Sequence, residues 1–178
     1  FKKAFYLADG GASHFSDAAG QTSSAPIANY FEDGIQIENL PSDFYSTQFY
    51  VNKLISYLDD KKEDANTDPF FGYLAFTAPH WPLQVPEDWQ NKFSGVYDDG
   101  WEKIRAQRIE SARKLGLISQ TAAAPPFPDA LGSWSDLSEE SKARESRKME
   151  LYAAMIAYLD NEIGRLIAYL KSSGKYEN

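Results

Sequence analysis

A run of apolar and aromatic residues from Phe70 to Phe76, followed at once by closely spaced prolines, constrains the fold of this chain most strongly. An unbroken apolar run of this length is typical of a strand that is buried on both faces, as in a parallel sheet. Pro79, Pro82 and Pro86 cannot continue such a strand, because proline has a fixed φ and no N–H to donate. The stretch predicts a buried strand that leads into a stiff loop.

His80 and Trp81 lie between the first two of these prolines. In open α/β sheets, ligands bind beyond the carboxyl ends of the strands, so we expect His80 to be catalytic and Trp81 to contact substrate. The alternative for His80 is an ordinary loop histidine. The other histidine, His14, lies in residues 11–29, a segment rich in Gly, Ala and Ser that we expect to be a surface loop. His14 is expected either to be solvated there or to contact substrate.

Three helices are predicted, over residues 46–61, 101–115 and 138–173. Ser46 and Ser138 are suitable N-cap residues, and Gly174 is suited to end the third helix. Apolar residues spaced three and four apart predict the face on which this third helix packs. These residues are Met149, Tyr152, Ile156, Leu159, Ile163, Leu166 and Leu170.

The order of these elements predicts an α/β fold. Short strands are expected at residues 5–8 and 35–37, and a helix followed by a buried strand over 69–77 is half of a βαβ unit. We therefore expect a mixed, mostly parallel sheet flanked by helices and incomplete at both ends. The chain begins at Phe1 rather than at a methionine, which suggests a segment of a longer protein.

Composition excludes several classes of function. The net charge of −8 over 178 residues argues against a nucleic-acid partner, which requires a clustered basic surface. No apolar run is long enough to predict a membrane span. The chain has no cysteine, so it has no disulfide and no thiolate metal ligand. No metal-binding, nucleotide-binding or nucleophile-elbow motif occurs, so we expect no metal site within this chain.

Residues 69–86, PFFGYLAFTAPHWPLQVP, resemble the middle motif of the sulfatases, in the arylsulfatase branch of the alkaline-phosphatase-like superfamily. Other stretches are similar to sulfatases in the same order along the chain. Residues 5–15 resemble the segment after the family's first lysine–histidine motif, and residues 40–46 resemble the entry to the next helix. Residues 149–155 and 160–165 resemble the long helix before the family's second metal motif. The resemblance covers essentially the whole chain.

The resemblance implies hydrolysis of sulfate esters, in particular aryl sulfates. Sulfatases carry a formylglycine nucleophile, made from the first residue of a C/S-x-P-x-R motif, and a calcium ion that binds the sulfate oxygens. Such a site neutralises a transferring anionic group and assists the leaving oxygen with a proton. By its position, His80 matches the family histidine that contacts the sulfate and assists the leaving group.

The chain lacks the motifs that would complete this site. It has no C/S-x-P-x-R motif, no early pair of aspartates and no late Ser-Asp-Asn-Gly metal motif. We therefore expect residues 1–178 to be the central segment of one sulfatase catalytic domain, with the nucleophile and calcium ligands supplied by the remainder of the parent chain. The isolated segment is expected to be inactive.

Two alternatives remain open from the sequence. The first is a phosphodiester or phosphonate ester hydrolase of the same superfamily. The second is a non-catalytic domain that binds a partner through residues 119–135 and the long helix.

Overall fold

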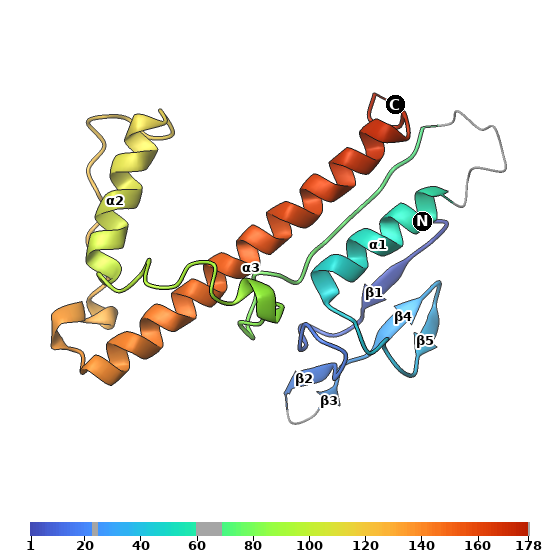
Figure 1. The fold of residues 1–178 in the computed structure, drawn as a ribbon, viewed down its shortest axis with the longest axis horizontal. Coiled ribbons are helices and arrows are strands. Elements are labelled where there is room, and N and C mark those ends of the chain that lie inside the picture. Colours follow the sequence, from blue (N-terminus) through green and yellow to red (C-terminus); the bar gives the residue numbers. More distant parts are fainter. Residues whose placement is uncertain (23–24, 60–68, 178) are drawn as a thin grey trace.

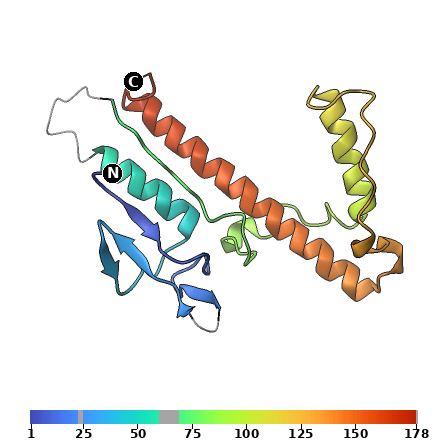
Figure 2. The same ribbon diagram turned by 180° about the vertical axis from the view of Figure 1, so that it is seen from behind.

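The computed structural model describes residues 1–22, 25–59 and 69–177, arranged around one long helix, α3 (Glu139–Ser172). Helix α1 (Ser46–Asp59) packs against the C-terminal half of α3, and two small sheets lie beside α1 (Figures 1 and 2). Helix α2 (Trp101–Lys114) stands at the opposite end of α3, on an extended arm. The molecule therefore has two parts that α3 joins. The body consists of the two sheets, α1 and the C-terminal half of α3, and the arm consists of α2 and the segment that connects it to the start of α3.

The sheets of the body are short and antiparallel. One sheet has the order β1–β4–β5, formed by Phe5–Leu7, Tyr30–Glu32 and Ile35–Ile37, and the other is the hairpin of β2 (Ala19–Thr22) and β3 (Ala25–Ile27). The strands predicted near residues 5–8 and 35–37 are confirmed. The prediction of a surface loop over residues 11–29 is wrong, because this segment contains the β2–β3 hairpin.

The mixed, mostly parallel sheet is not found among the described residues, where every strand pair is antiparallel. The turn between β4 and β5 shows why a hairpin forms there. Asp33 has φ 50° and Gly34 has φ 85°, which are the two positive values of a tight hairpin turn. A two-residue connection allows only antiparallel pairing, since a parallel pair needs a long crossover.

The prediction of a buried sheet strand at residues 70–76 is wrong. The segment is extended and runs between α1 and α3 in both views (Figures 1 and 2), but it pairs with no strand that the structure describes. Leu74 and Phe76 pack onto the body, whereas Phe71 is 79% exposed and Tyr73 is 72% exposed. The apolar pattern indicated the extended conformation, but sheet pairing depends on a neighbouring strand.

The body has two clusters of buried side chains. The first lies between the sheets and α1 and includes Tyr30, Phe44 and Tyr50. The second joins Met155 and its neighbours in α3 to Val85, a residue of the loop that follows His80. Burial of Met155 (0% exposed) and Val85 (1% exposed) therefore fixes this loop against α3.

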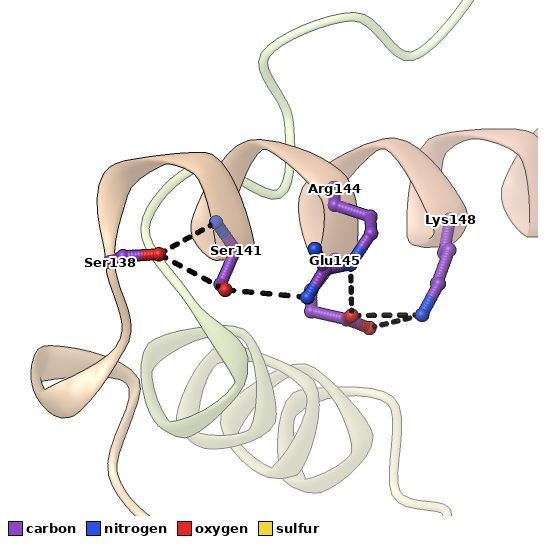
Figure 3. Close-up of polar contacts among 5 residues, drawn as sticks. All are labelled: Ser138, Ser141, Arg144, Glu145 and Lys148. Atoms are coloured by element: carbon purple, nitrogen blue, oxygen red, sulfur yellow. Dashed lines mark hydrogen bonds and ion pairs between the residues drawn. The ribbon is translucent and has the colours of Figure 1, made fainter.

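The predicted helices are confirmed with small changes at their ends. Helix α1 begins at Ser46, and the predicted end at residue 61 lies outside the described residues. Ser138 caps α3 by accepting a hydrogen bond from the backbone N–H of Ser141 (Figure 3). Gly174 (φ 71°) follows its last turn, as expected.

The predicted packing face of α3 is correct only in part, since Met149, Leu159, Leu166 and Leu170 are half-buried. The buried side of the helix carries Ala154, Met155 and Tyr158, together with Ser146, Glu150 and Glu162. The predicted residues Tyr152, Ile156 and Ile163 are 36%, 43% and 37% exposed. Helix α3 has apolar residues on two faces, and the elements that pack against it in this chain cover only one of them.

The arm carries α2 and the short helices η3 (Asp129–Leu131) and η4 (Trp134–Asp136). Trp134 anchors residues 119–135 to α2: the centroid of its ring lies 5.0 Å from that of Trp101, and its backbone N–H donates to Glu102 at 2.9 Å. None of the residues of α2, all of which the structure describes, is buried.

No helix in the described ranges is both long and apolar enough to cross a membrane.

Candidate functional site

The exposed ring of His80 is fixed by the backbone of its own loop. Its backbone N–H donates to the carbonyl of Thr77 at 2.9 Å, and its Nδ1 lies 2.7 Å from the carbonyl oxygen of Trp81. Because a carbonyl oxygen only accepts hydrogen bonds, Nδ1 carries the hydrogen of this contact. The Nε2 atom of His80 is then the ring nitrogen that can exchange a proton with a ligand.

His14 is buried (1% exposed) and lies directly behind this loop. Its Nε2 is 3.1 Å from the carbonyl oxygen of His80, and its Nδ1 is 2.9 Å from the hydroxyl of Ser46. The first contact requires a hydrogen on Nε2 of His14, so in the neutral ring Nδ1 accepts from Ser46. The structure thus brings the two histidines together through the His80 backbone.

Burial favours the neutral form of the His14 ring. Desolvation lowers its pKa from the ordinary value, and the nearby ring of His80 lowers that pKa further. The hydrogen bond to the His80 carbonyl acts in the opposite direction, but desolvation is the larger effect. A neutral ring that donates from Nε2 and accepts at Nδ1 satisfies both of its partners.

Two further contacts join residues around His14 to the His80 loop. The side-chain oxygen of Gln84 accepts from the backbone N–H of His14 at 2.8 Å and from the hydroxyl of Ser13 at 3.1 Å. The phenol of Tyr45 donates to the backbone carbonyl of Gln84 at 3.0 Å. Residues 13–14, the entry to α1 and the loop after His80 therefore form one hydrogen-bonded unit.

The indole of Trp81 is 64% exposed beside His80, where a ligand could reach it. Its backbone carbonyl also accepts from the side-chain amide of Gln21, a residue of β2. Gly11 leaves the space for this amide, since a Cβ at that position would come within 2.5 Å of it. The β2–β3 hairpin thus holds the loop at Trp81, in addition to the contacts at Gln84.

Sequence reasoning missed Gln21, Ser46 and Gln84 as parts of the site. Each is an ordinary polar residue in its local context, and Ser46 was interpreted only as a helix cap. Their importance comes from contacts with residues 32 to 70 positions away in the sequence. No local pattern carries that information.

The described residues do not fit a calcium ion. No group of three or more His, Asp or Glu side chains in the part of the chain that the structure describes could hold a metal. An open pocket of about 500 Å³ is lined by Phe15, Tyr45 and Trp89, with Asp43, Asp88 and Glu162 at its polar side. Neither His80 nor His14 lines this pocket.

The described residues can therefore supply one proton-exchanging imidazole in a fixed position. General acid or base catalysis requires such a group within hydrogen-bonding distance of the reacting oxygen. The ring nitrogens of His80 contact only the Trp81 carbonyl and the Gln21 amide among the described residues.

Comparisons with known proteins identify relatives along the whole chain. An uncharacterized sulfatase of Schizosaccharomyces pombe is 38% identical over 186 residues, which cover 100% of this chain and 33% of that protein. An arylsulfatase of Klebsiella aerogenes is 36% identical over 179 residues, which cover 100% of this chain and 38% of that protein. The chain thus spans between 33% and 38% of the length of these relatives.

The fold is also similar to a solved structure. The crystal structure of Ps i-CgsB in complex with k-i-k-neocarrahexaose matches with a TM-score of 0.57 at 18% identity. The match covers 100% of this chain and 30% of that one, and at this identity it indicates similarity of fold alone. The family model described as Sulfatase matches residues 3–178. The chain therefore belongs to the sulfatase family.

Proposed function

We propose that this chain is the central part of the catalytic domain of an arylsulfatase-type sulfuric ester hydrolase, and that His80 is its leaving-group acid. The observation that carries the proposal is the geometry of His80, whose Nδ1 is engaged by the Trp81 carbonyl while its ring is exposed. The 36% identity to an arylsulfatase supports the choice of reaction.

Cleavage of a sulfate ester breaks the bond between sulfur and the ester oxygen, and the electron pair of that bond goes to the oxygen. A proton delivered from Nε2 of His80 neutralises the oxygen as it leaves. Nδ1 keeps its hydrogen and donates it to the Trp81 carbonyl throughout, so the ring passes from the doubly protonated to the neutral form without turning. Fixed geometry of this kind is what makes acid assistance effective.

Trp81 is proposed to contact the organic part of the ester. Its exposed indole offers a flat apolar surface next to His80, and an aromatic substrate ring would pack against it favourably. Direct substrate contact by His14 is a weaker proposal, because its ring is buried behind the loop.

The nucleophile and the metal are proposed to lie on segments outside these 178 residues. Sulfatases use formylglycine and calcium, which together supply the attacking oxygen and the charge that stabilises the sulfate. The described residues contain no cluster for the metal, and the chain contains no C/S-x-P-x-R motif. We therefore propose that residues 1–178 form one part of a single catalytic domain and are inactive alone.

Exposed apolar surface supports this division of the domain. Phe71 and Tyr73 point away from the body on an extended segment, and Ile156 and Ile163 form part of an uncovered stripe on α3. Surfaces of this kind usually mark contacts with other protein. We propose that the remainder of the parent chain covers them.

The test compares the full-length protein with residues 1–178 on two substrates, an aryl sulfate and an aryl phosphodiester. The proposal predicts that the full-length protein hydrolyses the sulfate faster and that the segment hydrolyses neither. Preference for the phosphodiester would favour the alternative reaction, which the 26% identity to the multifunctional alkaline phosphatase superfamily protein PehA of Trinickia caryophylli keeps open. Turnover of neither substrate by the full-length protein would favour a non-catalytic domain.

A further inference from the structure

We propose that His14 is a positioning residue for His80: the N–H at Nε2 of His14 holds the His80 carbonyl and thereby fixes the direction of the His80 ring. The inference rests on the proposed function, in which that ring acts on substrate. It assigns a role to a buried histidine that the proposed reaction does not otherwise use.

The hydrogen bonds of His80 differ in which parts of the chain they connect. The bonds from its backbone N–H to Thr77 and from Nδ1 to Trp81 both stay within the loop. These bonds set the shape of the loop but do not set its place on the body. The bond from His14 to the His80 carbonyl joins residues 66 positions apart and attaches the loop at the reacting residue itself.

His14 is itself held firmly on the body. Its Nδ1 accepts from Ser46 at the start of α1, and the Ser46 hydroxyl lies 3.3 Å from that of Thr77. Its backbone carbonyl accepts from the Ser46 N–H at 2.8 Å, and its own N–H donates to Gln84 at 2.8 Å. The ring therefore has one orientation in which both nitrogens are satisfied, and that orientation aims Nε2 at the His80 carbonyl.

A purely structural histidine is the competing explanation, because His14 is buried in the body. Two substitutions of similar size separate the explanations. The amide nitrogen of Gln can take the place of Nε2, so His14→Gln can keep the donor to His80 while losing the contact with Ser46. Asn reaches only as far as Nδ1, so His14→Asn can keep the contact with Ser46 while losing the donor to His80.

The experiment measures kcat and KM of the full-length protein with an aryl sulfate for both variants, alone and combined with His80→Ala. Because small displacements of a catalytic group are costly, we expect His14→Asn to lower kcat by about 10- to 100-fold with little change in KM. His14→Gln is expected to stay within about threefold of wild type on the same grounds. In the His80→Ala background, His14→Asn should cause no further loss, since it acts through the missing ring.

Three results would overturn the inference. One is an equal loss of kcat in His14→Asn and His14→Gln. Another is the same loss from His14→Asn whether or not His80 is present. The third is a change confined to KM.

Hydrogen exchange of the full-length protein separates failure of this inference from failure of the proposed function. The His80 amide, which donates to Thr77, should exchange faster in His14→Asn than in wild type or His14→Gln. That pattern in a protein without sulfatase activity would retain the positioning role and reject the proposed reaction. Unchanged exchange in His14→Asn would reject the positioning role, whatever the activity.

Discussion

The loop around His80 and the arm around α2 are held in different ways. The His80 loop is tied to the body by polar groups that are themselves buried, with His14 1% exposed and Ser46 0% exposed. Within the arm the contacts lie nearer to solvent, such as the part-buried Trp134–Glu102 hydrogen bond and the exposed Lys103–Asp99 ion pair. Buried ties restrict a loop to one geometry, whereas solvent competes with exposed ones.

This difference indicates where the chain requires accurate placement. A group that transfers a proton must be held within a fraction of an ångström of its productive position. The buried contacts of the His80 loop suit the proton transfer that is proposed for His80. We therefore expect substitutions in the body to alter both stability and activity, and the effects of substitutions in the arm to remain local.

The largest effect on stability is expected from Met155→Ala. Met155 is fully buried in the cluster that joins α3 to Ala78 and Val85, on either side of His80. Removing a buried side chain of this size should lower the free energy of unfolding by about 2–5 kcal/mol, measured by denaturant titration of the full-length protein. The control, Leu117→Ala on the arm (73% exposed), should change it by less than about 0.5 kcal/mol. Similar losses in the two variants would remove the distinction between body and arm.

A smaller effect is expected from the titration of His14. Its pKa in the folded protein is lowered, chiefly by desolvation, from the value of 6.5 that applies to the unfolded chain. Between these two values the unfolded chain binds more protons, so this contribution to stability is complete above pH 6.5 and is lost as the pH falls below it.

The measurement is the free energy of unfolding of wild type and His14→Asn between pH 7 and pH 5. Wild type should lose more stability than the variant as the pH falls, by at most about 1.4 kcal/mol per pH unit from this one group. An identical pH dependence in the two proteins would mean that His14 is not held neutral by burial.

The smallest effect is expected from Trp134→Ala on the arm. Its ring packs edge-on against Trp101, a contact of a kind that contributes about 1 kcal/mol. The variant should increase hydrogen exchange in α2 without changing exchange in residues 77–84 or the rate of aryl sulfate hydrolysis. A fall in kcat would show that the arm contributes to the active site after all.

Local features of the fold were predictable from the sequence. Ser138 and Gly174 mark the ends of α3 through the hydrogen bonds of adjacent turns, and both positions are confirmed. The Asp33–Gly34 pair is an equally local signal for the β4–β5 hairpin, although it was not recognised. Such features depend only on residues a few positions apart.

Features that depend on distant neighbours were not predictable. Residues 70–76 have the composition of a buried strand, yet Phe71 and Tyr73 are exposed because no described strand lies beside them. The two apolar faces of α3 gave no indication of which one α1 and the His80 loop would cover. The position of His80 in its motif identified it as the candidate catalytic residue, but the support from His14 appears only when residues 66 positions apart are brought together.

The most direct test of the account is the rate of aryl sulfate hydrolysis by the full-length protein carrying His80→Ala, with Trp134→Ala as the control. Loss of a leaving-group acid should lower kcat by about 10- to 1,000-fold, while the free energy of unfolding stays close to that of wild type, since the His80 ring is exposed. Trp134→Ala should retain the wild-type kcat. An unchanged kcat in His80→Ala would contradict the account, because it would remove His80 from the reaction.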